Sequence, residues 1–172
     1  MKSFLIHHSN CKERDGYVKT IVEKTNALVI DPVWCPYFPT LGCILSHIKV
    51  ARLGEGGYYV FEDDCEIVED FLNIPLDYDI IYFGINGKAF QRRPIECMHY
   101  WGTHALYISE RARKILIDNW EKELEVLYPK GFPAIDEILS VLIVRHSLSF
   151  KIYDSVRQAK GLVSSISGTV RK

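Results

Sequence analysis

The sequence predicts an α/β fold, in which one domain has a mostly parallel central sheet flanked by helices. Two observations carry this prediction. A strand–helix–strand succession occupies about the first thirty residues, and such a unit favours parallel pairing of its two strands. Further along, the runs 58–61 and 79–84 are rich in aromatic and β-branched residues, which is typical of buried strands.

The N-terminal unit begins with the short apolar run 3–7, which predicts the first strand. After a polar break, apolar residues at helical spacing predict a helix over about 12–24. The run 27–30 predicts the second strand. Asp31-Pro32 ends it, because this dipeptide favours a turn.

Residues 33–40, which are rich in proline and aromatic side chains, predict a loop with some rigidity. A helix is expected over about 41–53, because its apolar residues share one face and a glycine-rich stretch follows it. The strand at 58–61 comes next and runs into three consecutive acids. Residues 70–72 are expected to begin a short helical turn before Pro75.

The next strand is expected at 79–84, followed by a polar loop over 85–94 and a strand that ends the segment 100–108. Ser109 is a good N-cap residue for a helix that extends to about Leu127. The acids of this helix are expected to form its solvated face; they are Glu121, Glu123 and Glu125.

The C-terminal part starts with an apolar segment of helical period over 134–145, and 150–153 predicts a last strand. The tail 161–172 is rich in serine and glycine and is expected to be loosely ordered. The chain shows no internal repeat and no linker, so the predicted domain covers 1–160.

Composition excludes several functional classes. The 172 residues include 21 basic and 22 acidic side chains mixed along the chain, unlike the basic face of a nucleic-acid-binding protein. No apolar run approaches the roughly 20 residues of a membrane span. The short apolar segment near Met1 is also too short for a signal peptide. The five cysteines form no CxxC pair, which argues against a structural zinc site and a dense disulfide framework. We therefore expect free thiols and a cytoplasmic location.

The acids Glu62, Asp63 and Asp64 are the most informative feature of the chain. Three adjacent carboxylates raise one another's pKa and each loses water when packed, and a divalent cation offsets that cost. Oxygen ligands at a strand end suit Mg²⁺ or Mn²⁺, which usually share their coordination shell with substrate phosphates. The alternative is a solvated acidic turn after a strand.

Four segments in this order resemble glycosyltransferase family 25, the lipopolysaccharide-type glycosyltransferases, and its viral relatives. They are the GCxLSH element at Leu41–His47, the strand-plus-EDD element at Val60–Asp64, the GTxAYxIS-like element at Gly102–Ser109 and the late xxD element at Ala134–Asp136. The resemblance implies a GT-A fold, a Rossmann-like α/β sandwich that binds a nucleotide-sugar and a divalent metal. The chain departs from the family at Ile6-His7-His8, where members show an Ile-Asn-Leu-like strand end.

The resemblance also implies roles for the acids. Asp64 is expected to be the main ligand of Mn²⁺ or Mg²⁺, with Glu62 contacting the ribose or assisting at the metal; Asp63 could exchange roles with either. The metal would stabilise the charge that develops on the diphosphate leaving group. The expected donor is a UDP-sugar, and the expected acceptor is a hydroxyl of a glycan or a lipid-linked saccharide.

Further candidates for donor or acceptor binding follow strand ends or lie in the resembling segments. They are His7, His8, Ser9, Asn10, Arg14, Asp31, Ser46, His47, Trp101, Gly102, Thr103 and His104. Arg14 could pair with the diphosphate through its planar guanidinium. Each position also has a structural alternative: a polar loop, a turn, a core histidine or tryptophan, or, for Arg14, a solvated surface residue. His47 is also expected to bond the acidic segment.

Inverting transfer needs a base within hydrogen-bond reach of the acceptor hydroxyl. By the resemblance, Asp136 is the expected base and Glu137 the second candidate. Their alternative role is to complement the dipole at the start of a helix. Two other functions stay open: a degenerate module that binds nucleotide or glycan without turnover, and a metal-dependent nucleotidyltransferase or phosphohydrolase.

Overall fold

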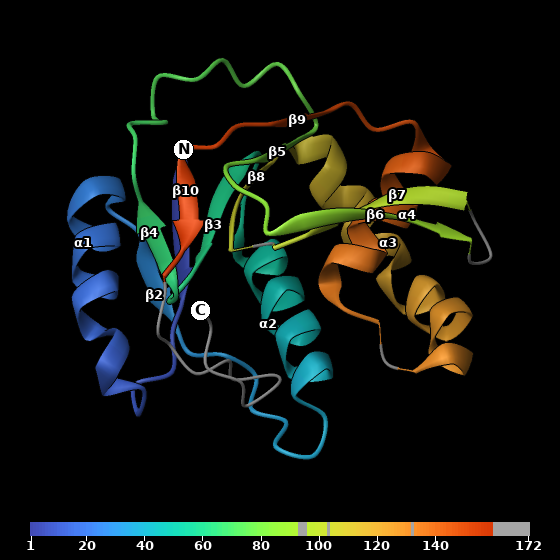
Figure 1. Cartoon of the computed structure of the whole chain (residues 1–172), viewed down its shortest axis with the longest axis horizontal. Helices are drawn as coiled ribbons and strands as arrows, with labels where there is room; N and C mark the ends of the chain where they lie inside the picture. The colour runs from blue at the N-terminus through green and yellow to red at the C-terminus, as the bar shows by residue number, and fades with distance from the viewer. Residues whose placement is uncertain (93–95, 103, 132, 160–172) are drawn as a thin grey trace.

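A six-stranded sheet forms the centre of the protein (Figure 1). The computed structural model describes residues 1–92, 96–102, 104–131 and 133–159. In spatial order the strands are β2 (Leu28–Ile30), β1 (Lys2–Ile6), β3 (Tyr58–Glu62), β8 (Ala105–Ile108), β5 (Ile80–Tyr82) and β9 (Phe150–Ile152). All run parallel to one another except β8, which is antiparallel to both of its neighbours. The predicted α/β fold with a mostly parallel sheet is confirmed.

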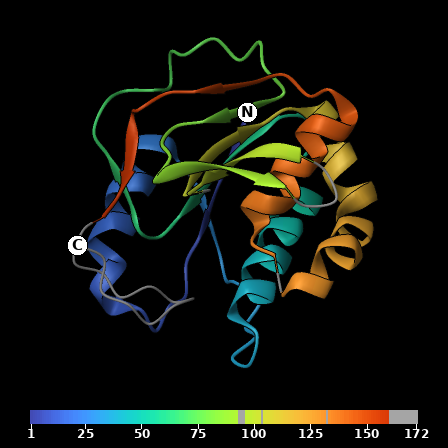
Figure 2. The ribbon, with the colours of Figure 1, turned by 45° about the vertical axis from the view of Figure 1, so that its right-hand side comes forward.

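Helices cover both faces of the sheet (Figure 2). They are α1 (Asp15–Thr25), which follows the 3₁₀ turn η1 (Lys12–Arg14), α2 (Pro39–Leu53), α3 (Glu110–Leu127), which leads into the 3₁₀ turn η2 (Tyr128–Lys130), and α4 (Ile135–His146). Helix α1 lies against one face, and α2, α3 and α4 lie against the other. As expected, Ser109 caps α3, since its side chain accepts a hydrogen bond from the backbone N–H of Ala112.

The alternation of side chains along β3 divides the core between the two faces. Tyr58 and Val60 pack with residues of α2, α3 and α4, whereas Tyr59 and Phe61 pack on the side of α1. Phe61 is completely buried, and burying such a side chain stabilises the fold by about 1.5–3 kcal/mol. Strand β3 is therefore fixed from both sides, and so is the position of the acids at its end.

A second, two-stranded sheet pairs β4 (Cys65–Ile67) with β10 (Val156–Gln158), which the sequence did not predict. The backbone N–H of Val156 donates a 2.7 Å hydrogen bond to the carbonyl of Phe83. A Cβ atom on Gly84 would lie only 1.7 Å from the carbonyl oxygen of Val156. Glycine at position 84 therefore lets β10 approach the end of β5 and continue toward the acidic cluster.

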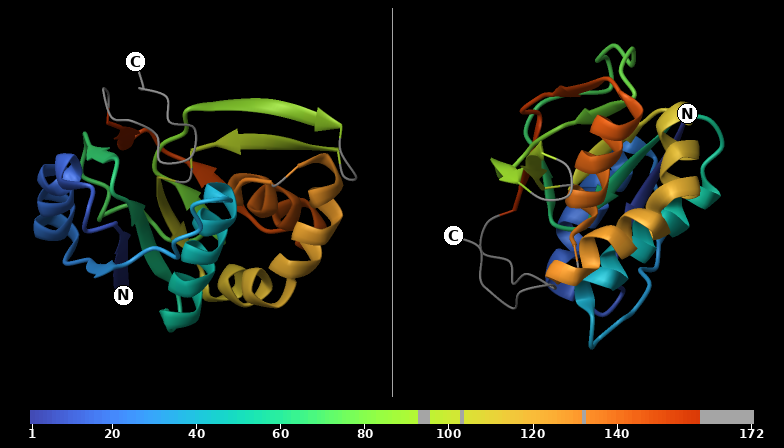
Figure 3. Two further views of the ribbon diagram at one scale, coloured as in Figure 1. Left: turned by 90° about the horizontal axis from the view of Figure 1, so that it is seen from below. Right: turned by 90° about the vertical axis from the view of Figure 1, so that its right-hand side faces the viewer.

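The predicted loop over 85–94 is wrong. This part of the chain contains β6 (Gly87–Arg92), which pairs antiparallel with β7 (Glu96–Trp101). The hairpin projects from the central sheet and lies beside α4 (Figure 3). Its position brings Gly102, immediately after β7, close to the start of α4.

Two smaller predictions are also corrected. Residues 71–74 form a hydrogen-bonded turn without a helix, and the side chain of Asp70 accepts the backbone N–H of Leu72. Glu123 is buried, whereas Glu121 and Glu125 are exposed. The reason is that residues two positions apart on a helix lie on nearly opposite faces, so the three glutamates cannot share one face.

The tail 161–172 lies outside the described residues. Among the described helices, none combines the length and apolarity needed to cross a membrane.

Candidate functional site

The carboxyl ends of β1 and β3 meet because the two strands are parallel neighbours, with Ile6 opposite Glu62. The residues that follow these strands, His7 and Asp63, therefore lie side by side. Their side chains share a 2.9 Å hydrogen bond between Nδ1 and Oδ2, and both are buried. Ligands of α/β proteins collect at this edge of the sheet.

Asp63 also forms a buried ion pair with Arg14, whose guanidinium contacts the other carboxylate oxygen. Burial lowers the pKa of Arg14, but the charge and hydrogen bond of Asp63, together with the charges of Asp64 and Cys11, outweigh it and raise the pKa above its ordinary value. Both oxygens of Asp63 are thus engaged by buried side chains. Arg14 is a buried partner of the acidic cluster, and the alternative of a solvated surface residue is excluded.

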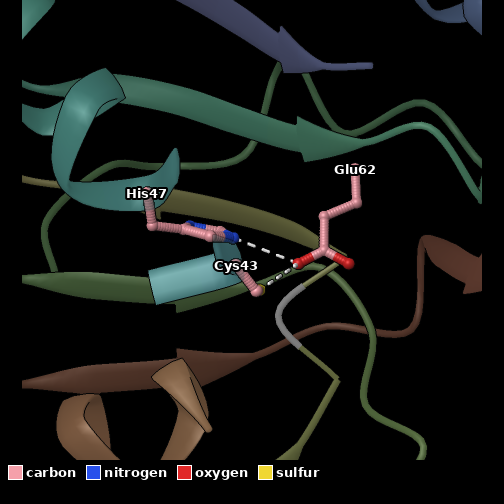
Figure 4. A group of neighbouring side chains, drawn as sticks. All are labelled: Cys43, His47 and Glu62. Carbon is pink, nitrogen blue, oxygen red and sulfur yellow. Dashed lines mark hydrogen bonds and ion pairs between the residues drawn. The ribbon is translucent and has the colours of Figure 1, made fainter. Parts of the chain in front are cut away.

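Glu62 contacts the helix on the opposite side of the cluster (Figure 4). Its Oε1 lies 3.0 Å from Nε2 of His47 and 4.0 Å from Sγ of Cys43. The expected contact of His47 with the acidic segment is present. Burial, followed by the charges of Glu62, Asp136 and Asp64, raises the pKa of Cys43 well above its ordinary value, so its sulfur is a protonated thiol at neutral pH.

Asp64 forms hydrogen bonds with two residues at the end of the described chain, Gln158 and Ala159. Its Oδ2 accepts a 2.7 Å hydrogen bond from the side chain of Gln158, and its carbonyl accepts one from the backbone N–H of Ala159. The neighbouring residue Cys65 is buried, and its thiol donates to the carbonyl of His104. The same carbonyl accepts the backbone N–H of Glu62. The carbonyl of His104, the residue directly before β8 (Ala105–Ile108), therefore holds both flanks of the acidic cluster.

Asp136 and Glu137 lie in the first turn of α4 and are both buried. Oδ2 of Asp136 accepts a 2.9 Å hydrogen bond from the backbone N–H of Gly102. Oε2 of Glu137 accepts one of 3.0 Å from the backbone N–H of Ala134 and so caps the helix. The charge of Asp136 contributes to the raised pKa of Cys43 on the facing helix α2.

A cavity of about 250 Å³ opens beside the acids. Seven predicted site residues line it: His8, Arg14, Ser46, His47, Glu62, Asp63 and Asp64. The other described candidates are not among its lining residues: His7, Ser9, Asn10, Asp31, Gly102, His104, Asp136 and Glu137. Ser9, Asn10 and Asp31 are exposed. Thr103 and the side chain of Trp101 lie outside the described part of the chain.

The loop 33–38 and helix α2, which begins at Pro39 inside the predicted loop 33–40, form the opposite wall of the cavity. Ser46 joins them, because its hydroxyl donates to the carbonyl of Gly42 and accepts the backbone N–H of Val33. A Cβ atom on Gly42 would lie 2.8 Å from the carbonyl oxygen of Val33, so glycine permits this close approach. Ser46 therefore has a structural role in addition to any ligand contact.

Sequence reasoning missed the aromatic part of this wall. Trp34 is 68% exposed, yet it lines the cavity and packs edge-on against His8, with ring centroids 5.0 Å apart. An aromatic residue in a proline-rich loop directly after a strand was the available signal. An exposed tryptophan at a cavity mouth offers a flat surface for a planar or sugar ligand.

Comparisons with known proteins establish the fold. No protein-family model matches the chain, and no curated protein matches it significantly. One similar structure is a nucleoside-diphosphate-sugar pyrophosphorylase from Vibrio cholerae RC9, at 11% identity and a TM-score of 0.54 over 92% of this chain and 76% of that chain. Another is a glycosyltransferase involved in glycosylation of the major capsid of PBCV-1, at 10% identity and a TM-score of 0.51 over 89% and 81%. At these identities the likeness shows a shared α/β architecture.

Proposed function

We propose that this protein is a metal-dependent transferase acting on a nucleotide-diphospho-sugar, and specifically a glycosyltransferase. The observation that carries the proposal is the acidic cluster Glu62, Asp63 and Asp64, which lies at the carboxyl edge of the sheet and lines a cavity. Ligands bind at this edge in α/β folds, and grouped carboxylates there suit a cation paired with phosphates. The fold shared with a nucleotide-sugar pyrophosphorylase and a glycosyltransferase is consistent with this chemistry.

The carboxylates have different roles in this proposal. Asp63 is bound on both oxygens by Arg14 and His7, so its role is to fix the geometry of the cluster. Asp64 and Glu62 would hold Mn²⁺ or Mg²⁺, since carboxylate oxygens are the ligands that these ions prefer. When bound, such an ion neutralises charge on the departing diphosphate. Arg14 lines the same cavity and adds a fixed positive charge.

Donor and acceptor would occupy different parts of this edge. The cavity wall that includes His8 and Trp34 offers the nucleotide of a UDP-sugar an aromatic surface. The acceptor hydroxyl of a glycan or lipid-linked saccharide would approach from the side of Gly102 and α4. Asp136 would accept its proton there as the sugar is transferred with inversion. Glu137, which already caps α4, is the weaker candidate for this base.

A nucleotidyltransferase is the second candidate, because the fold matches a pyrophosphorylase as well as it matches a glycosyltransferase. The two functions differ in the bond that breaks. A glycosyltransferase releases nucleoside diphosphate from the donor, whereas a pyrophosphorylase consumes pyrophosphate and releases nucleoside triphosphate and a sugar phosphate. A binding module without turnover would release neither.

The deciding experiment incubates the purified chain with a panel of UDP-, GDP- and CMP-sugars, with Mn²⁺ or with EDTA, and separates the products by chromatography. We expect release of UDP that requires Mn²⁺ and is lost in Asp64→Asn. The matched control is Asp118→Asn, which removes an exposed carboxylate of α3 that does not line the cavity. Nucleoside triphosphate formed on addition of pyrophosphate would overturn the proposal in favour of the second function. Metal-independent release, or a fully active Asp64→Asn, would contradict the metal site.

A further inference from the structure

Cys43, His47 and Glu62 bring three different metal-ligating atoms together at the cavity wall. Cys43 and His47 lie four residues apart on α2 and therefore share one face of that helix. Glu62, at the end of β3, points its carboxylate at this face (Figure 4). One sulfur, one imidazole nitrogen and one carboxylate oxygen lie within 4.8 Å of one another.

The spacing of these atoms is close to that of a tetrahedral centre. Bond lengths of 2.0–2.3 Å to a zinc ion place its ligand atoms roughly 3.3–3.8 Å apart. In the structure, Oε1 of Glu62 lies 3.0 Å from Nε2 of His47 and 4.0 Å from Sγ of Cys43. Changes of about an ångström, which side-chain rotation can supply, would bring all three atoms to one ion.

The chemistry of this donor set differs from that of the acids alone. Mg²⁺ and Mn²⁺ favour carboxylate oxygens, whereas thiolate and imidazole select softer ions of the zinc class. The cavity beside the cluster has two further free thiols in its wall, those of Cys11 and Cys35. A soft cation that enters the cavity therefore meets several sulfur atoms. Among the described residues, Cys43 is the cysteine whose sulfur lies close enough to both a histidine nitrogen and a carboxylate oxygen to share one ion with them.

We propose that Cys43, His47 and Glu62 form a three-ligand site for a thiophilic divalent cation, with its fourth position open to the cavity. Binding would release the thiol proton of Cys43 to solvent and leave Nε2 of His47 as a lone-pair donor. The fourth ligand would be a water molecule or an anionic oxygen of a cavity ligand, as in zinc sites that keep one open position. The site does not depend on the proposed sugar transfer, with which it shares Glu62.

Cobalt is the probe, because Co²⁺ substitutes for Zn²⁺ and reports sulfur ligation by a thiolate-to-metal charge-transfer band. The reduced, metal-free full chain is titrated with Co²⁺, and Zn²⁺ is then added. We expect one equivalent of Co²⁺ to give the charge-transfer band together with the visible bands of a tetrahedral centre. Zn²⁺ is expected to remove both. Absence of the charge-transfer band in the wild type would overturn the proposal.

Variants identify the ligands. Cys43→Ser is expected to lose the sulfur band, whereas Cys35→Ser, which removes another thiol of the cavity wall, is expected to keep it. His47→Gln should weaken Co²⁺ binding, and circular dichroism checks that each variant is folded. A band that survives in Cys43→Ser, or that disappears equally in Cys35→Ser, would refute the assignment.

The two proposals can fail separately. Asp64→Asn is expected to lose Mn²⁺-dependent release of UDP and yet to keep the cobalt–sulfur band. A wild-type chain that releases UDP with Mn²⁺ but shows no sulfur band would leave the transferase proposal standing and remove the thiophilic site. A wild-type chain that shows the sulfur band but releases no UDP would support the cation site and contradict the transferase proposal.

Discussion

The side chain of Gln158 donates a 2.7 Å hydrogen bond to Oδ2 of Asp64, so a residue far along the chain orients the proposed metal ligand. Strand β10 brings it there by pairing with β4, where Gln158 lies opposite Cys65. Asn86 in turn donates to the amide oxygen of Gln158. The position of the carboxylate therefore depends on three segments that are distant in sequence.

Gln158→Ala should weaken Mn²⁺ binding at Asp64 without unfolding the chain. Residues that orient a metal ligand typically contribute about 10–100-fold in affinity or activity. Calorimetric titration with Mn²⁺ in the presence of UDP measures the effect. Asn73→Ala removes an exposed amide elsewhere and should change nothing. Unchanged Mn²⁺ affinity in Gln158→Ala would show that Gln158 does not position the metal ligand.

Asp136→Asn should abolish sugar transfer while leaving donor binding nearly intact. The amide keeps an oxygen that can accept the backbone N–H of Gly102, but it cannot take a proton from an acceptor hydroxyl. General-base catalysis contributes about 10²–10⁴-fold, so a loss of that order is expected. Turnover and thermal stabilisation by UDP are measured in parallel, with Glu125→Gln as an exposed control. Transfer at the wild-type rate would remove Asp136 from the mechanism.

Arg145→Ala should destabilise the protein by about 1–3 kcal/mol, because it leaves the buried carboxylate of Glu123 without this partner. Arg145 binds Oε1 of Glu123 at 2.8 Å, and the side chain of Glu123 is only 1% exposed. Urea denaturation measures the loss. The double variant Glu123→Met with Arg145→Met should recover most of it, whereas Glu121→Ala at an exposed position should have little effect. Equal losses in the single and double variants would refute the charge explanation.

Asp79→Asn should lower stability at neutral pH and have progressively less effect in acid. Burial raises the pKa of Asp79, but hydrogen bonds from Ser149 and Ser109 and the charge of Arg111 outweigh it and lower the pKa below its ordinary value. The carboxylate therefore stabilises the fold above its unfolded pKa of about 3.9, and this contribution is lost as pH falls through the lower folded value.

The expected difference between wild type and Asp79→Asn is about 1–3 kcal/mol at neutral pH. Urea denaturation at a series of pH values from neutral to strongly acidic measures it. Asp77→Asn, at an exposed position two residues away, serves as the comparison. A difference that grows as the pH falls would contradict the sign of this argument.

Sequence reasoning predicted the parts of the fold that depend on local pattern. The strand–helix–strand start, the strand before the acids and the capped helix after Ser109 each carry their own periodicity or cap. The position of Glu62 at a strand end followed from the same reasoning. Hydrophobic periodicity predicts a helix or strand correctly when one face of that element packs against the core.

The missed parts depend on long-range pairing. Strands β4 and β10 are three residues each, and their partnership, which includes the ion pair of Glu66 and Arg157, joins segments that carry no strand pattern of their own. The hairpin that starts at Gly87 was not predicted, because the polar residues of this segment indicated a loop. The burial of Glu123 could not be seen without its partner Arg145. Propensity is a weak guide where tertiary contacts decide.

The reversed direction of β8 has a consequence for how the molecule can diversify. An antiparallel strand begins at the edge where its parallel neighbours finish, so the chain just before Ala105 opens onto the same rim as Glu62. The hairpin formed by β6 and β7 is inserted at that point. Lengthening or reshaping it would remodel this rim, while the six central strands and their packing stayed as they are.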